Sequence, residues 1–238
     1  MQYWGITDRG AVRSQNQDAF AFRVLDDGRI LAVVCDGMGG ARAGNIASAM
    51  TVELFPDAFS HIDGDDVHRM GQAAIQANDQ VFQRAITDDD CAGMGTTLVA
   101  ALVGTGHALL LNVGDSRAYR INEGGIRQVT RDHSVVEDMV KSGRLTREEA
   151  RNHPRKNLIT RALGCEPQLR ADLFHEDTSP NDWLLLCSDG LSNLVTEQEM
   201  LYEVIHGGDA DTCCQRLLEI AMHRGAPDNV TVVLVRCG

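Results

Sequence analysis

Four aspartates border apolar runs of the chain, and they are its strongest chemical signal. Asp36 follows ILAVVC, Asp115 follows ALLLNVG, Asp189 follows WLLLCS, and Asp228 comes just before VTVVLV. An ionised carboxylate at the rim of a core must be paired or bound to a metal ion. Asp and Gly are also the commonest turn residues, so any one of these positions alone is better explained as a turn. Repeated beside several nearly uncharged strands, the placement favours a metal site.

The residue types around these aspartates narrow the chemistry. Oxygen ligands suit hard cations such as Mg²⁺ or Mn²⁺. Zinc calls for His or Cys at a recognisable spacing, which this sequence does not have. Arg13 lies in a polar segment that leads into an apolar strand. Taken alone it is an ordinary surface arginine, but near a carboxylate–metal cluster a guanidinium binds phosphate through two hydrogen bonds.

Strands and helices must position these residues. Apolar residues at i, i+3 and i+4 predict helices near 67–85 and 210–222, and two more are expected near 44–55 and 197–205. Helices and strands do not alternate regularly, which excludes a doubly wound parallel sheet. We expect an α+β fold of antiparallel sheets packed on each other with helices outside, in a single domain over residues 1–238. Short runs rich in Val, Leu or Ile predict the strands, at 19–25, 29–35, 96–103, 108–113, 116–122, 183–187 and 230–235.

The composition excludes several classes of protein. A net charge of -12 argues against nucleic acid or an anionic membrane as the main partner. The N-terminus has no signal-peptide pattern, and no stretch approaches the roughly 18 apolar residues that a membrane span needs. The seven cysteines are an odd number without a CxxC pair, so we expect free thiols and a cytoplasmic location.

Eight segments of the sequence, in order, resemble the metal-dependent (PPM, or protein phosphatase 2C-like) serine/threonine phosphatases in their compact bacterial form. They are RSQNQDAF, VVCDGMGG, MGTTLVAALV, LNVGDSRAYRI, RDHS, LITRALG, LLLCSDGLSN and DNVTVVLV. Each segment alone is a weak signal, but together they cover the chain from Asp8 to Val235. The resemblance implies a four-layer α-β-β-α sandwich with a binuclear metal site at one edge.

The resemblance also implies a role for individual residues. Two Mn²⁺ or Mg²⁺ ions, with a possible third, would activate water to attack phosphoserine or phosphothreonine. Met38 stands where eukaryotic members carry a His proposed as general acid, so the proton donor stays open. The expected site residues are Asp36 bridging both metals, the Gly37 carbonyl on one of them, Asp189 and Asp228 on the other, Gln17 and Asp18 acting mainly through water, Asp115 with Asp189 at a third metal, and Arg13 on the phosphate.

By the same resemblance, residues 134–161 form a flap beside the active site. The partners would be phosphorylated proteins, including a cognate Ser/Thr kinase and its substrates, and the chain would act as a monomer. His133 and His153 have no metal role in the resemblance, so we expect them to be structural or surface residues.

Two rival functions remain open at the level of sequence. Gly114-Asp115-Ser116 is similar to the GDS triplet of some serine esterases, but Ala118 stands where a nucleophile elbow needs Gly. A catalytically inactive phosphoprotein-binding module would have lost at least one metal aspartate, whereas Asp36, Asp189 and Asp228 are all present. Metal-dependent hydrolysis of a simple aryl phosphate would separate the three functions.

Overall fold

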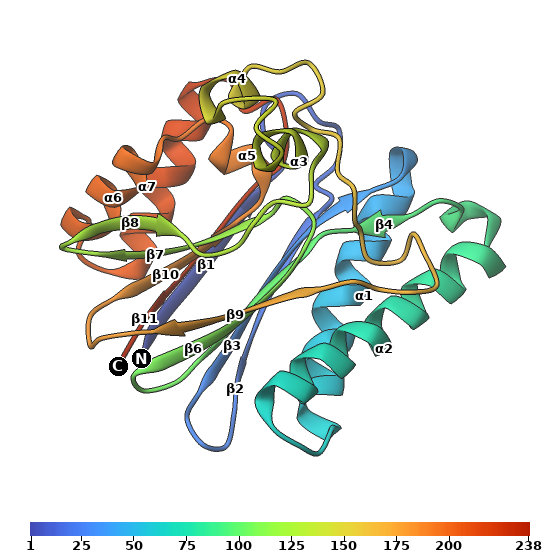
Figure 1. Ribbon diagram of the computed structural model, residues 1–238, viewed down its shortest axis with the longest axis horizontal. Coiled ribbons are helices and arrows are strands. Elements are labelled where there is room, and N and C mark those ends of the chain that lie inside the picture. The colour runs from blue at the N-terminus through green and yellow to red at the C-terminus, as the bar shows by residue number, and fades with distance from the viewer.

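Two antiparallel β-sheets lie face to face at the centre of the molecule (Figure 1). The computed structural model describes residues 1–238 except for the side chains at 40–42. One sheet has the order β1-β11-β10-β7-β8, and the other β2-β3-β5-β6-β9 with the short β4 paired to β3. The strands are β1 (Gln2–Asp8), β2 (Asp18–Val24), β3 (Ile30–Met38), β4 (Gly95–Thr96), β5 (Leu98–Val103), β6 (His107–Val113), β7 (Arg117–Asn122), β8 (Gly125–Gln128), β9 (Asp172–Asp177), β10 (Trp183–Cys187) and β11 (Val230–Arg236).

Helices cover both outer faces of the sandwich. α1 (Gly40–His61) and α2 (Asp66–Thr87) pack on the sheet that contains β3, and α6 (Glu197–His206) and α7 (Ala210–His223) pack on the other (Figure 1). The expected α+β, four-layer α-β-β-α fold is confirmed. The short helices are η1 (Asp89–Cys91), α3 (Val135–Lys141), α4 (Arg147–Arg151) and α5 (Asp189–Ser192). Across the part of the chain that is described, none of these helices is both long and apolar enough to cross a membrane.

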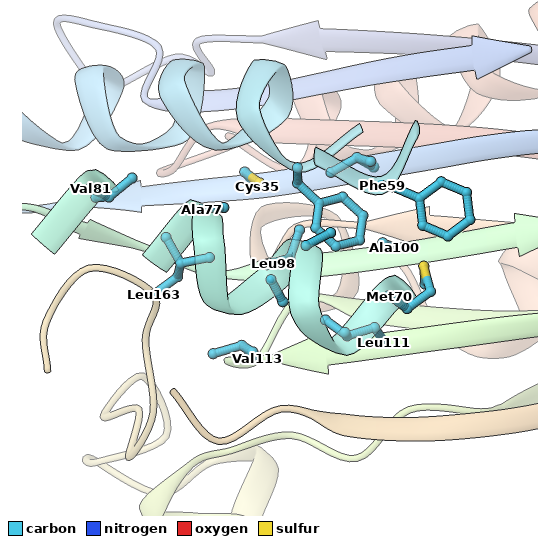
Figure 2. Close-up of a cluster of buried hydrophobic side chains, with 14 of the residues drawn as sticks. Cys35, Phe59, Met70, Ala77, Val81, Leu98, Ala100, Leu111, Val113 and Leu163 are labelled. Atoms are coloured by element: carbon cyan, nitrogen blue, oxygen red, sulfur yellow. The ribbon is translucent and has the colours of Figure 1, made fainter. Parts of the chain in front are cut away.

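The alternation of side chains along β3 shows why the chain forms layers. Leu31, Val33 and Cys35 point into a core shared with α1 and α2, part of which Figure 2 shows. Ile30, Ala32 and Val34 point the other way, into a core between the two sheets. Successive side chains of a strand face opposite sides, so a strand apolar on both faces must be covered on both. The uninterrupted run ILAVVC therefore fixes β3 in the interior.

Three strands that the sequence did not predict, β1, β8 and β9, are all edge strands of their sheets. An edge strand buries less of its surface and often carries polar side chains, which weakens its apolar pattern. β1 begins with three exposed residues and has Gly5 at its centre. β9 reads DLFHED, with a charged residue at each end. The predicted central strands are present, with boundaries shifted by a few residues.

The prediction that the first helix ends near Phe55 is wrong, because α1 continues through Pro56 to His61. Proline removes one helix hydrogen bond and usually breaks a helix. Here Phe55 and Phe59, one turn apart, are both fully buried in the core beneath α1. Their burial stabilises the helix on both sides of the proline and outweighs the lost bond.

Candidate metal centre

Asp18 and Asp36 are directly opposite each other on the neighbouring strands β2 and β3. Asp36 therefore lies inside a strand, and the interpretation of Asp36-Gly37 as a turn is wrong. β3 continues to Met38 because Gly37 and Met38 pair with the short strand β4. The two carboxylates are thus fixed by backbone pairing on adjacent strands, at the end of the sheet from which α1 begins.

A buried network of hydroxyl groups holds the carboxylate of Asp18, which is only 8% exposed. Its Oδ2 accepts hydrogen bonds from the hydroxyls of Ser188 at 2.6 Å and Thr231 at 2.7 Å. These donors belong to the other sheet or its ends, so Asp18 links the two sheets. Its Oδ1 is buried and has no hydrogen-bond partner. A buried carboxylate oxygen without a partner is costly unless a cation or water satisfies it.

Asp36, Asp115, Asp189 and Asp228 line one pocket of about 500 Å³. Asp115 lies in the tight turn between β6 and β7, Asp189 is the first residue of α5, and Asp228 is two residues before β11. Segments far apart in the sequence thus bring all four carboxylates to one end of the sandwich. Arg13, Gln17, Met38 and Asn157 line the same pocket.

The carboxyl groups raise one another's pKa. Burial, then the charges of Asp18 and Asp189, raise the pKa of Asp36 well above its ordinary value. Burial is also the main reason that the pKa of Asp115 rises to about 8, and Asp189 adds to it. Burial raises the pKa of Asp18 to about 7 although two hydroxyls donate to it. Such clustered, mutually repelling acids are typical of a site that binds cations.

Arg13 is the cation at the edge of this cluster. Its NH2 donates to Asp228 Oδ2 at 2.7 Å. That hydrogen bond is the main reason that the pKa of Arg13 is raised, and the charges of Asp36 and Asp189 also contribute. The side chain is 53% exposed, so its remaining donors can reach a ligand in the pocket. The structure therefore places Arg13 with the predicted metal aspartates.

Gly37 has no room for a side chain. A Cβ atom there would lie 2.1 Å from the carbonyl oxygen of Gly44 and 2.6 Å from that of Gln17. The Gly37 N–H donates to the Gln17 carbonyl at 3.0 Å. The start of α1 and the segment before β2 thus close tightly around this position, which holds the Gly37 backbone in the wall of the pocket.

The donors in the pocket fit a hard divalent cation. Among the side chains that the structure describes, no three His, Cys, Asp or Glu residues form a closed metal-binding group. The pocket nevertheless offers oxygen ligands with several negative charges, and Asp18, whose Oδ1 has no partner, is paired across the strands with Asp36 of the pocket wall. Carboxylate and carbonyl oxygens are the ligands that Mg²⁺ and Mn²⁺ prefer. These residues therefore fit the cations that the sequence predicts.

Several residues that support the site were missed at the level of sequence. The Thr97 hydroxyl accepts from the Asp36 N–H at 2.9 Å and shares a 2.7 Å hydrogen bond with the Ser116 hydroxyl. Ser116 is fully buried, so it cannot act as the nucleophile of a serine hydrolase. His133 is 5% exposed and accepts from the Gly114 N–H, which makes it structural rather than a surface residue. Thr97 lies inside a predicted strand and Ser116 directly follows Asp115, which is the signal that could have found them, whereas His133 was expected only as a structural or surface residue.

A second cavity of about 890 Å³ adjoins the pocket and shares Asp115, Asn157 and Asp189 with it. One wall is the predicted flap, in which α3 and α4 lie near α5 at one end of the sandwich (Figure 1). Residues 192–197, from the end of α5 to the start of α6, also line this second cavity. The predicted flap thus lines a groove that is continuous with the pocket of the four aspartates.

Comparison with known proteins identifies the class. Residues 9–219 match the Protein phosphatase 2C family. The serine/threonine phosphatase stp of Listeria welshimeri is 39% identical over 234 residues, which cover 96% of this chain and 93% of that protein. The crystal structure of the serine/threonine phosphatase PstP from Mycobacterium tuberculosis has a TM-score of 0.91 at 34% identity, covering 99% of this chain and 98% of that one.

This chain belongs to the protein phosphatase 2C family, and the resemblance seen in the sequence is confirmed. A structure of the PstP catalytic domain in complex with two manganese ions has a TM-score of 0.86 at 34% identity, covering 98% of this chain and 96% of that one. That protein therefore binds Mn²⁺, one of the two cations that the sequence of this chain predicts.

Proposed function

We propose that this chain hydrolyses phosphoserine and phosphothreonine esters in proteins with the help of divalent cations. The observation that carries the proposal is the convergence of four carboxylates and the Arg13 guanidinium on one pocket. Family membership supports the reaction class. We further propose that residues 1–238 form one catalytic domain, which acts as a cytoplasmic monomer on phosphorylated proteins, including a cognate kinase.

The pocket residues divide into cation ligands and a phosphate-binding group. When bound, the cations supply an activated water as nucleophile and neutralise charge on the phosphate. Arg13 binds the phosphate oxygens through the donors that Asp228 does not use. We assign Asp36 to two cations, Gly37 to one of them through its carbonyl, Asp189 and Asp228 to the other, Asp18 to a supporting role, and Asp115 with Asp189 to a third cation.

The test is hydrolysis of p-nitrophenyl phosphate and of a phosphothreonine peptide with and without Mn²⁺. We expect activity to disappear in excess chelator and to return when Mn²⁺ is restored. Calorimetric titration counts the cations, and Asp115→Ala is expected to bind one fewer than the parent. Full activity after thorough metal removal would refute the function, and equal stoichiometry would refute only the third site.

Removal of Arg13 should weaken substrate binding more than turnover. If the guanidinium binds the substrate phosphate, Arg13→Ala is expected to raise KM about 10-fold, because a charge-assisted hydrogen bond contributes roughly 1.5–3 kcal/mol. Arg13→Lys should restore only part of the lost substrate affinity, since an ammonium group cannot form the bidentate contact. Steady-state kinetics on p-nitrophenyl phosphate measures both parameters. Unchanged kinetics in Arg13→Ala would leave it an ordinary surface arginine.

The flap groove should affect protein substrates selectively. Arg151 lines the groove, whereas Arg144 is an equally exposed flap arginine outside the lining. Arg151→Glu is expected to lower kcat/KM for the phosphopeptide several-fold while p-nitrophenyl phosphate hydrolysis stays unchanged, because only the peptide extends into the groove. Arg144→Glu is the charge-matched control. Equal effects of the two substitutions on the peptide would mean that the flap acts only through its net charge.

A further inference from the structure

The side chain of Asn229 fastens the loop that carries Arg13 to the start of β11. This loop connects β1 to β2 and spans residues 9–17. Asn229 is 5% exposed. Its Nδ2 donates to the carbonyl of Arg9 at 2.8 Å and to that of Gln15 at 2.9 Å. Its Oδ1 accepts from the Gln17 N–H at 2.8 Å. One buried amide therefore holds the loop at its beginning and at its end.

Asn229 is also connected by hydrogen bonds to Asp228 and Arg13 on one side and to Gly37 on the other. Its backbone N–H donates to Asp228 Oδ1 at 2.9 Å, and Asp228 Oδ2 accepts from Arg13 at 2.7 Å. On the far side of the loop, the Gln17 carbonyl accepts from the Gly37 N–H at 3.0 Å. Hydrogen bonds thus run from Asn229 to the phosphate-binding arginine, to a proposed cation ligand and to the Gly37 backbone.

The amide at position 229 is suited to this task by its chemistry. It meets two carbonyl oxygens with its two N–H donors and one N–H with its oxygen. Aspartate has no such donors, and hydrophobic side chains offer neither donor nor acceptor. Without the amide, the carbonyls of Arg9 and Gln15 would both lose these hydrogen bonds. The loop would still be joined to the segment before β11 by the hydrogen bond from the Ala11 N–H to the Ala226 carbonyl and by the ion pair of Arg13 with Asp228.

We propose that Asn229 is a positioning residue that sets the orientation of Arg13 toward the substrate phosphate. The inference rests on the proposed phosphatase function and adds a residue that acts through Arg13: Asn229 lines the pocket, but its side-chain amide is engaged by the backbone of the loop. A guanidinium held in place before binding loses less freedom when phosphate arrives. Loosening the loop should therefore reduce phosphate affinity even though Arg13 is still present.

The experiment compares Asn229→Ala with Asn78→Ala as a matched control. Asn78 is 1% exposed, and its amide also ties a distant loop, through the Gly164 N–H and the Glu166 carbonyl. Asn229→Ala is expected to raise KM for p-nitrophenyl phosphate and the Kd of inorganic phosphate about 10-fold, as loss of a preorganised contact does. Asn229→Ser, which keeps one hydrogen-bonding group, should fall between parent and Asn229→Ala. Thermal melting identifies any variant that fails to fold.

The deciding measurement is a double-mutant cycle with Arg13→Ala. If Asn229 acts through Arg13, then Asn229→Ala should change phosphate affinity less than about 2-fold once Arg13 is absent, because coupled residues are not additive. Equal effects in both backgrounds, or the same loss in Asn78→Ala, would overturn the proposal and leave Asn229 a residue of general stability. Calorimetric phosphate binding does not require turnover, so it tests the role of Asn229 even if the parent has no activity. An inactive parent would count against the proposed function alone.

Discussion

Asp36→Asn is expected to lower kcat by at least ~100-fold, because loss of a charged ligand removes a few kcal/mol of transition-state stabilisation. The same variant should unfold at a higher temperature than the parent in the presence of chelator. Burial and four neighbouring aspartates raise the pKa of Asp36 well above its ordinary value. A neutral amide of the same shape relieves that repulsion, so activity and stability should change in opposite directions.

The measurement is kcat for p-nitrophenyl phosphate in Mn²⁺, together with the melting temperature in chelator. Asp26→Asn is the control, since Asp26 is exposed on the loop between β2 and β3, at the opposite end of β2 from Asp18, and does not line the pocket. It removes the same charge and should change neither quantity. An Asp36→Asn variant with wild-type turnover, or one that melts earlier than the parent in chelator, would contradict the role assigned to Asp36.

The sequence singled out the aspartates of the candidate site because their physical setting is extreme. Ionisable residues beside long apolar runs such as ILAVVC and WLLLCS conflict with burial unless something binds them. Asp36, Asp189 and Asp228 stand out in this way from the many other acidic residues of the chain. The structure brings all three to one pocket.

The sequence could not reveal the partners that hold these aspartates, because those contacts depend on strand register. Asp18 faces Asp36 only because β2 and β3 pair as they do, and a shift by one residue would turn Asp18 to the other face. Ser188 and Thr231 reach Asp18 from the second sheet, 170 and 213 residues away. Hydroxyl and amide groups of this kind look like ordinary polar residues until the two sheets are packed.

The stability of the protein in chelator should fall as the pH rises between about 4 and about 8. An unfolded aspartate has a pKa near 3.9, whereas in the fold the pKa of Asp18 is about 7 and that of Asp115 about 8. Over this range the folded protein holds protons that the unfolded chain has released. The stability that these two groups contribute is therefore fully present below pH ~4 and is lost as the pH rises through their folded pKa values.

Asp18→Asn removes one of these two titrating groups and so measures its contribution to the pH dependence. The amide oxygen can still accept from Ser188 and Thr231, and the amide nitrogen replaces the unpartnered Oδ1. We expect the melting temperature of this variant in chelator to depend less steeply on pH than that of the parent, with the gap widening up to pH ~7, since each pKa unit corresponds to about 1.4 kcal/mol. Asp26→Asn should follow the parent curve.

Two further features make the comparison decisive. Burial lowers the pKa of His133, which makes stability rise with pH near its titration and partly masks the fall, so the difference between parent and Asp18→Asn is more informative than either curve alone. In saturating Mn²⁺ the melting temperature of the parent should instead rise with pH, because cations bind the ionised carboxylates and compete with protons. Parallel melting curves for parent and Asp18→Asn in chelator would show that Asp18 is already ionised in the fold, and the buried network would then have to hold a charge instead of a proton.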